Sequence, residues 1–175
     1  SCLVGSEMCI RDSNYVLAMT DVDHFKKFND THGHDVGDQV LRLVASKLSK
    51  VTGGGRAYRY GGEEFALVFA GKTIEECIPH LEAVREMIAN YAIQLRNQES
   101  RPQDDQQGRQ RRGTASGGAV SVTISIGACE RQPEHRTPEE VLKSADQALY
   151  NAKGAGRNCV MAHGQKERRG AMRVA

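Results

Sequence analysis

The sequence predicts one α+β domain in which strands alternate with helices around a central sheet. Three observations support this fold class. The chain has 175 residues, 39% of them hydrophobic, which is enough for one buried core and too few for two full domains. Apolar side chains recur at strand spacing in some segments and at helix spacing in others. These segments alternate along residues 15–162, as strand, two helices, hairpin, helix, strand, helix and strand.

The first strand and two helices occupy the N-terminal part of this region. The apolar run 15–20 predicts a buried strand that ends at Asp21, Val22 and Asp23. Residues 24–30 have the length of a short helix. Apolar residues from Val36 to Val51 recur three and four positions apart, which predicts a one-faced helix closed by the glycines 53–55.

A hairpin with acidic residues at its tip comes next. Residues 57–60 and 65–70 are strand-forming runs, and Gly61-Gly62 lies where the hairpin would turn. Glycine permits close backbone approach to a ligand, and the adjacent Glu63 and Glu64 offer hard oxygen ligands for a divalent cation. The alternative is an ordinary Gly-Gly turn with solvated acids.

The third predicted helix begins at a T-x-x-E capping box on Thr73, and its apolar stripe reaches Leu95. Pro79 is expected to delay its start or to bend it. Residues 120–129 alternate apolar and polar side chains, which predicts a strand with one apolar face.

The last predicted helix opens with a second capping box at Thr137, with proline at the first helical position. Gly154 and Gly156 end this helix, and residues 159–162 form a last short strand.

Three segments lie outside this pattern. Residues 1–14 lack clear periodicity, and we interpret them as a fragment boundary or an artificially added segment. Residues 97–118 contain Gln, Arg and Gly but no large apolar side chain, which predicts a flexible insertion. The polar tail 163–175 is expected to fray.

The composition excludes several classes of protein. The 24 basic and 22 acidic residues leave a net charge of +2, so no overall field favours a nucleic acid or a membrane as partner. No apolar run approaches the roughly 18 residues that span a bilayer, and no signal peptide is visible. We therefore expect a cytoplasmic domain, alone or as the cytoplasmic part of a larger sensor protein.

Five scattered cysteines without a C-x-x-C pair argue against a disulfide framework and against a zinc site. They favour a reducing compartment. Cys77, Cys129 and Cys159 fall within apolar patterns and are expected to be small core residues.

Four carboxylates are expected to converge if the first strand lies beside the hairpin, namely Asp21, Asp23, Glu63 and Glu64. Their mutual repulsion would raise their pKa values, and a bound cation is the usual relief. Because only oxygen donors are on offer, Mg²⁺ or Mn²⁺ is favoured over zinc. Two such ions about 4 Å apart can activate a hydroxyl and stabilise a leaving oxygen, which indicates a nucleoside triphosphate as substrate.

Cations and a base-reading pair complete this hypothesis. Lys26 can meet a phosphate from its short helix, and Lys153 and Arg157 flank a glycine turn from which both can reach the same phosphates. Each of these cations alone is also compatible with an ordinary solvated surface residue. Asn29 and Asp38 offer an amide and a carboxylate that can read the edge of guanine.

The residues that carry this chemistry lie in four separated blocks. In chain order these are Asp21-x-Asp23-x-Phe25-Lys26-x-x-Asn29-Asp30-x-x-Gly33-His34-x-x-Gly37-Asp38, Arg59-Tyr60-Gly61-Gly62-Glu63-Glu64-Phe65, the strand 122–127, and Ala145-Asp146-x-Ala148-Leu149-Tyr150-x-Ala152-Lys153-x-x-Gly156-Arg157-Asn158. Together they resemble the GGDEF domain of bacterial diguanylate cyclases. The resemblance covers residues 15–161 apart from the insertion.

The resemblance implies a palm-like nucleotidyl cyclase fold with a five-stranded sheet, antiparallel at its centre and wrapped by helices. It implies that two GTP molecules are joined into cyclic di-GMP with release of two pyrophosphates. The active species would be an antiparallel homodimer in which each 3′-hydroxyl attacks the α-phosphate held by the other half-site. A sensory or regulatory domain would precede this one in the full-length protein.

The resemblance also implies roles for individual residues. Magnesium, as two ions per site, would be held by Asp21, the backbone carbonyl of Val22 and Glu63, with Glu64 as a neighbouring essential acid. Asn29 and Asp38 would bind guanine, while phosphates would be bound by Lys26, Lys153, Arg157 and the backbone of His24 and Phe25.

Two features depart from the pattern of the family. The positions of its Arg-x-x-Asp product-inhibition motif are occupied by Thr52 and Gly55, so we expect no feedback inhibition through that site. The Asp-x-Leu-Thr-Gly-Leu-x-Asn-Arg pattern that opens the family domain has no counterpart in residues 1–14.

Two alternative functions remain from the sequence. One is a catalytically weak module that binds GTP or cyclic di-GMP and acts through a partner. The other is a magnesium-dependent nucleotidyl transferase with a different substrate.

Overall fold

The structure, a computed structural model, describes residues 14–94 and 119–164. Its centre is a five-stranded sheet with the order β2-β3-β1-β6-β7. The strands are β1 (Tyr15–Val22), β2 (Arg56–Gly61), β3 (Glu64–Ala70), β6 (Ile124–Glu130) and β7 (Val160–Ala162). β1 pairs antiparallel with both β3 and β6, whereas β6 and β7 run parallel. The predicted sheet, antiparallel at its centre, is confirmed.

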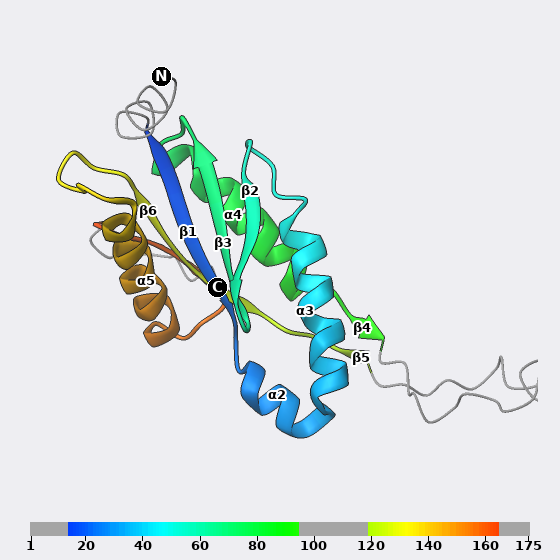
Figure 1. Ribbon diagram of the computed structural model, residues 1–175. Helices are drawn as coiled ribbons and strands as arrows, with labels where there is room; N and C mark the ends of the chain where they lie inside the picture. Colours follow the sequence, from blue (N-terminus) through cyan, green and yellow to red (C-terminus); the bar gives the residue numbers. More distant parts are fainter. Residues whose placement is uncertain (1–13, 95–118, 165–175) are drawn as a thin grey trace, which may run out of the picture.

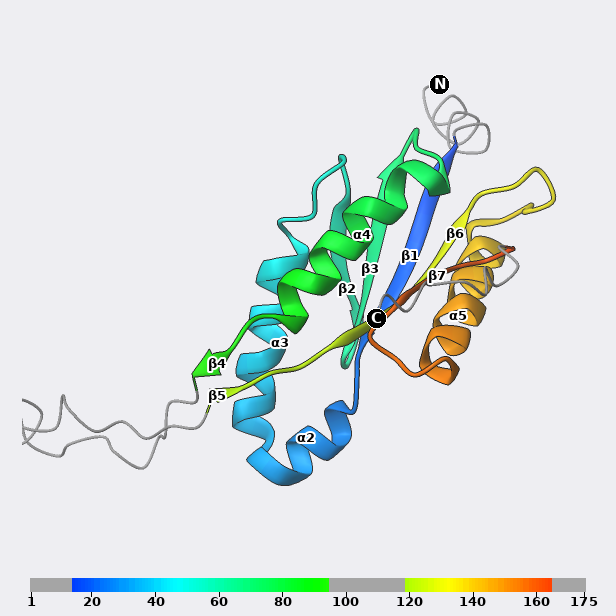
Figure 2. The same ribbon diagram turned by 180° about the vertical axis from the view of Figure 1, so that it is seen from behind.

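The helices of the described residues are α2 (Phe25–His32), α3 (His34–Leu48), α4 (Ile74–Ala89) and α5 (Pro138–Gly154). Of these, α3 and α4 cover one face of the sheet and α5 the other, while α2 lies beyond one end of the sheet beside α3 (Figures 1 and 2). Because side chains alternate along a strand, Val16 and Ala18 of β1 join the core under α3 and α4, while Met19 joins the core under α5. The α+β fold class predicted from the sequence is confirmed.

The helix α4 begins as predicted but ends earlier. The capping box is present, since Thr73 Oγ1 accepts from the N–H of Glu76 and the Glu76 carboxylate accepts from the N–H of Thr73. The helix begins at Ile74 despite Pro79, so the expected late start is wrong. It ends at Ala89, and Ile93–Gln94 forms strand β4 instead of a further helical turn.

The predicted strand 120–129 is divided in two. Ala119–Val120 forms β5, which pairs with β4 in a separate two-stranded sheet, and β6 begins only at Ile124. β6 also lacks the predicted polar face, because α4 contacts one side of it and α5 the other, and Ser125 is fully buried. The hydroxyl of Ser125 is satisfied by a hydrogen bond to the Asp23 carboxylate, which removes the cost of burying it.

The helix α5 starts as predicted, but its capping box is not formed. Thr137 is the N-cap residue and Pro138 the first helical residue, yet the Thr137 side chain makes no capping hydrogen bond. The carboxylate of Glu140 instead accepts from the backbone N–H of Arg136. The prediction of a reciprocal capping box is therefore wrong, although the helix boundary is right.

The cysteines of the described residues behave as core residues. Cys77 and Cys129 are buried and Cys159 is half-buried. Burial raises the pKa of Cys77 to about 11, which disfavours its thiolate at neutral pH. The predicted insertion 97–118 lies outside the described residues, as do nearly all of the predicted N-terminal segment and tail. Across ranges 14–94 and 119–164, no helix combines the length and apolar character needed to cross a bilayer.

Candidate active site

The end of β1 and the β2–β3 turn meet at one end of the sheet, beside the start of α2 (Figure 1). Asp21 is paired across the antiparallel ladder with Glu64. The backbone N–H of Val22 donates to the carbonyl of Glu63 over 3.4 Å. The predicted meeting of the first strand with the acidic hairpin tip is therefore confirmed.

The hairpin tip is closed on itself and open to its surroundings. The guanidinium of Arg59 donates to the carbonyl of Gly62 over 2.7 Å, which fixes the turn from within. A Cβ atom added at Gly61 or Gly62 would meet nothing within 4 Å. The tip is thus not packed against the core and has room for a ligand beside Glu63.

Two carboxylates of this site are less easily ionised than usual. Burial raises the pKa of Asp21, which is only 6% exposed, while its hydrogen bond and charge interaction with Lys153 lower it. Burial also raises the pKa of Glu63, and the neighbouring charges of Asp21 and Glu64 raise it further. A bound divalent cation would favour the charged form of both groups.

A lysine from the far end of the sequence reaches Asp21. The Nζ atom of Lys153, in the last turn of α5, lies 2.9 Å from Asp21 Oδ2. Close packing of α5 on β6 brings it there, because a Cβ at Gly127 would lie 1.9 Å from the backbone nitrogen of Leu149. Only glycine allows the helix backbone to approach the strand this closely.

The other predicted phosphate-binding residues surround the same end of the sheet. His24 adopts a left-handed conformation with φ 57°, which turns the chain from β1 into α2. Phe25 is buried and anchors the first turn of α2, and Lys26 beside it is exposed. Arg157 is exposed in the turn after α5, and its charge lowers the pKa of Asp21. Within the described part of the chain, Lys26 forms no ion pair with the site acids.

The predicted guanine-reading residues lie at the junction of α2 and α3. Asn29 Oδ1 is buried, and no group in the described residues donates a hydrogen bond to it. A Cβ at Gly37 would lie 1.8 Å from that oxygen, so the absence of a side chain at Gly37 makes room for it. Asp38 follows Gly37 and is exposed. A buried acceptor without a donor indicates a ligand that supplies one.

Asp23 adds negative charge near Asp21 and so raises the pKa of Asp21, but its carboxylate is held by hydrogen bonds from other elements. Its Oδ1 accepts from Ser125 Oγ and its Oδ2 from Thr123 Oγ1, both at 2.7 Å, and Oδ2 also accepts from the backbone N–H of Asn158 at 3.1 Å. These three donors occupy the carboxylate. The donors lie far away in sequence, and the alternating Ser and Thr on the predicted strand are the only sequence signal for them.

The oxygen atoms near the hairpin tip that are free to bind a metal suit a magnesium or manganese ion bound together with a phosphate. In the two described ranges, no three His, Cys, Asp or Glu side chains are grouped as a ready metal cage. Asp21 and Glu63 supply two carboxylates, and the carbonyl of Val22 directly follows Asp21 in the chain. Such hard oxygen donors suit Mg²⁺, which usually keeps water or substrate phosphate oxygens as its other ligands.

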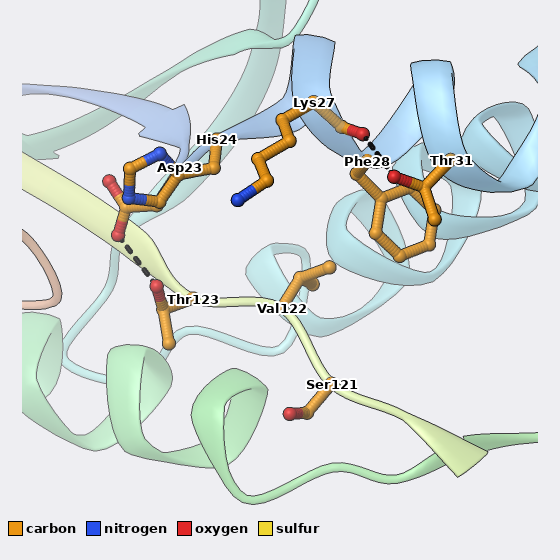
Figure 3. Close-up of a pocket in the computed structure, with 8 residues that line it drawn as sticks. All are labelled: Asp23, His24, Lys27, Phe28, Thr31, Ser121, Val122 and Thr123. Carbon is orange, nitrogen blue, oxygen red and sulfur yellow. Dashed lines mark hydrogen bonds between the residues drawn. The ribbon is translucent and has the colours of Figure 1, made fainter. Parts of the chain in front are cut away.

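A hollow of about 290 Å³ lies on another face of α2 (Figure 3). It is lined by His24, Lys27, Phe28 and Thr31, and by residues 121–123 together with Asp23. Of the residues that the sequence predicts to bind nucleotide, only His24 is among them. Lys26 and Asn29, on the same helix, do not line this hollow.

Comparison with known proteins shows the family. The family model described as "Diguanylate cyclase, GGDEF domain" matches residues 6–107 and 99–159 of this chain. Diguanylate cyclase VdcA of Vibrio cholerae is 38% identical over 146 residues, covering 83% of this chain and 38% of that protein. Response regulator PleD of Caulobacter vibrioides is 37% identical over 144 residues, covering 82% of this chain and 28% of that protein.

A solved structure supports the same assignment. The GGDEF domain of DgcB from Caulobacter crescentus, crystallised in complex with c-di-GMP, superposes with a TM-score of 0.74 at 33% identity. The match covers 92% of this chain and 84% of that one. The chain described here therefore belongs to the GGDEF domain family of diguanylate cyclases and has its palm-like α+β fold. It spans well under half the length of the two curated relatives.

Proposed function

We propose that this domain is a diguanylate cyclase that condenses two GTP molecules into cyclic di-GMP. The observation that supports this most directly is the contact between Lys153 and Asp21. In this proposal Lys153 is a phosphate-binding cation and Asp21 a metal-binding carboxylate, and their contact, near Glu63 at the open tip of the hairpin, supports a shared site. Nucleotidyl transfer needs these two kinds of group at one phosphate.

The cations around the site bind the triphosphate. Lys153 and Arg157 approach from the end of α5, and Lys26 with the backbone N–H groups of His24 and Phe25 approaches from the start of α2. The N-terminus of a helix carries a partial positive charge and unpaired N–H groups, both of which favour phosphate oxygens. When GTP binds, its phosphates compete with Asp21 for the ammonium of Lys153.

Asn29 and Asp38 select guanine. The Watson–Crick edge of guanine presents an N–H and an amino group, and the unpaired Oδ1 of Asn29 and the carboxylate of Asp38 are acceptors for them. Adenine has no donor at the corresponding ring nitrogen, so one acceptor would stay unpaired. Buried polar groups left without a partner are the strongest source of such discrimination.

In the reaction, the 3′-oxygen of one GTP forms a bond to the α-phosphorus of the other. The bond from that phosphorus to the bridging oxygen breaks, pyrophosphate leaves, and the hydroxyl proton is released. The same exchange at the second GTP closes the ring, so two pyrophosphates leave for each cyclic di-GMP. Because each domain has one such site, the two GTP molecules are brought together by an antiparallel homodimer.

The acids hold the ions that this chemistry uses. Asp21, Glu63 and the carbonyl of Val22 would bind Mg²⁺ or Mn²⁺, with two ions per site. Bound there, the metal supplies Lewis-acid stabilisation of the phosphate charge and activation of the hydroxyl. Glu64 contributes negative charge next to Asp21 and so favours cation binding.

Two further features follow from the proposed activity. The curated relatives are much longer than this chain, and one of them is named a response regulator, so we propose that a regulatory domain precedes this one in the full-length protein. At the product-inhibition motif, Thr52 Oγ1 is hydrogen bonded to His80 Nδ1 at 2.7 Å. Thr52 and Gly55 offer no charge to bind cyclic di-GMP, and feedback inhibition through this motif is expected to be absent.

The test is incubation of the purified protein with GTP and Mg²⁺ over a range of protein concentrations. Cyclic di-GMP is expected, with a specific activity that rises with protein concentration as dimers form. Tight GTP binding without pyrophosphate release would instead favour the binding module, and turnover of another triphosphate in preference to GTP would favour a different transferase.

A further inference from the structure

The Asp23 carboxylate ties three separate parts of the chain together. It is 6% exposed, it follows β1 directly, and it accepts from Thr123 and Ser125 at the start of β6 and from the N–H of Asn158 after α5. Figure 3 shows it turned toward Thr123. We infer that Asp23 is a positioning residue that holds the 156–158 turn so that Arg157 and Lys153 face the phosphates. This inference rests on the proposed function.

The 156–158 turn needs such support because its backbone is strained. Gly156, Arg157 and Asn158 have φ angles of 116°, 65° and 48°, so all three are left-handed. Residues with a Cβ atom disfavour this region, and two in succession persist only when their surroundings fix them. Arg157 is thus held in a conformation that its own residue type does not favour.

Three hydrogen bonds fix the turn, and two of them come from distant elements. The N–H of Arg157 donates to the carbonyl of Ala152 at 3.0 Å, within the end of α5. The N–H of Asn158 donates to Asp23, and the guanidinium of Arg85 in α4 donates to Asn158 Oδ1 at 2.9 Å. The backbone and the side chain of Asn158 are therefore each anchored to a different part of the fold.

This anchoring couples the two halves of the site. Asp23 lies two residues after Asp21, the predicted metal ligand. The turn that it holds carries Arg157 and follows the last turn of α5, where Lys153 contacts Asp21. One buried carboxylate thus joins the metal-binding end of β1 to the turn that follows the phosphate-binding end of α5.

Replacing Asp23 separates this role from metal binding. Asp23→Ala removes both carboxylate oxygens that accept these hydrogen bonds. It should weaken GTP binding about tenfold, because charge-assisted phosphate contacts are lost. GMP lacks the outer phosphates and should bind within about twofold of its affinity for wild type. Asp23→Asn keeps one carbonyl oxygen for the N–H of Asn158 and should restore the preference for GTP over GMP. If Asp23 were a metal ligand, Asn would restore binding poorly, because its amide oxygen carries no charge. Ser125→Ala is the matched control, since it removes one bond to Asp23 but leaves the contact with Asn158.

Affinities for GTP and GMP are measured with Ca²⁺ in place of Mg²⁺, with circular dichroism to check folding. If Asp23→Ala does not fold, Arg85→Met tests the second anchor. It should lower the GTP to GMP preference, whereas Lys72→Met, which removes another cation of an ion pair near α4, should not.

The possible failures are distinguishable. Wild-type protein that does not prefer GTP over GMP would contradict the proposed function itself. If folded Asp23→Ala keeps the wild-type preference for GTP over GMP, the positioning role alone is overturned. If Asp23→Ala is unfolded, the same preference in Arg85→Met overturns it. Loss of the preference in both Asp23→Ala and Asp23→Asn would also overturn it, in favour of metal binding by Asp23.

Discussion

Gly37 is expected to be required for guanine selectivity and not for folding. A Cβ atom at this position would lie 1.8 Å from Asn29 Oδ1 and 3.2 Å from the ring of Phe25. The close atom is the end of a side chain that can rotate, so Gly37→Ala should move Asn29 without disturbing the backbone. The substitution therefore separates the predicted base-reading group from the stability of the domain.

The two energy terms in Gly37→Ala nearly cancel. Ala in place of Gly favours a helix by about 0.5–1 kcal/mol. Rotation of Asn29 away from its preferred rotamer costs of order 0.5–1.5 kcal/mol. The net change should stay within about 1 kcal/mol, which corresponds to a melting temperature within about 4 °C of wild type. Loss of one acceptor should weaken GTP binding about tenfold, because the donor on guanine is left unpaired.

The assay combines thermal denaturation with GTP and ATP titrations in Ca²⁺. Gly154→Ala is the matched control, because it lies at the end of a helix with nothing within 4 Å of the added Cβ. It should leave the preference for GTP over ATP unchanged. If Gly37→Ala keeps the wild-type preference while folded, Asn29 does not read the base. A large loss of stability would show instead that Asn29 cannot move aside for the added Cβ atom.

Three further predictions follow from the site. Gly127→Ala should destabilise the fold by about 3 kcal/mol or more, because the added Cβ atom would meet the backbone of α5. An unchanged melting temperature in thermal denaturation would contradict this. Glu63→Gln should abolish turnover. It should also abolish the rise in melting temperature that Mg²⁺ produces in wild type, since a metal that binds the native state stabilises that state. If Mg²⁺ still raises the melting temperature of Glu63→Gln, Glu63 is not a metal ligand. The pKa values of Asp21 and Glu63 are raised in the folded protein. The metal-free protein therefore loses stability as the pH rises from their unfolded toward their folded pKa values, because the folded state holds these protons more tightly. Mg²⁺ binds more weakly as the pH falls through the same interval, because it competes with the protons. Mg²⁺ titrations from neutral pH down to about pH 4 check this, and an affinity that does not change would contradict it.

The order and type of most elements could be predicted from periodicity, because each buries one apolar face. Val40, Val44 and Leu48 are buried on α3 as their spacing predicts, and the hairpin turns next to Gly62. The predicted end of α4 and the predicted start of β6 are both wrong because β4 and β5 pair with each other. Apolar residues beyond Ala89 continue the helical pattern but pair in β4, and tertiary contacts decided the outcome.

The site could be predicted in part. The sequence predicts that Asp21 meets the acidic hairpin tip if the first strand lies beside the hairpin, and the structure confirms that placement. The sequence also groups Asp23 with these acids, and its charge does raise the pKa of Asp21, but its hydrogen-bond partners are not predictable from the sequence. Its true partners, Thr123 and Ser125, are brought by β6, and no local pattern shows which carboxylate they will bind.

The sequence also does not predict that Gly37 leaves room for the Asn29 side chain or that Gly127 lets α5 approach β6. Both depend on which atoms lie opposite the missing Cβ, and those atoms belong to Asn29 and Leu149. A glycine in a pattern indicates a special backbone or a close approach, but it does not name the neighbour.

The product balance of the purified protein with GTP and Mg²⁺ tests its proposed cyclase activity. Chromatography of the nucleotides and a pyrophosphate assay should give one cyclic di-GMP for every two pyrophosphates, and Glu63→Gln should give neither. GTP that binds and is recovered unchanged at protein concentrations where a dimer is present, or pyrophosphate released without cyclic di-GMP, would contradict the account.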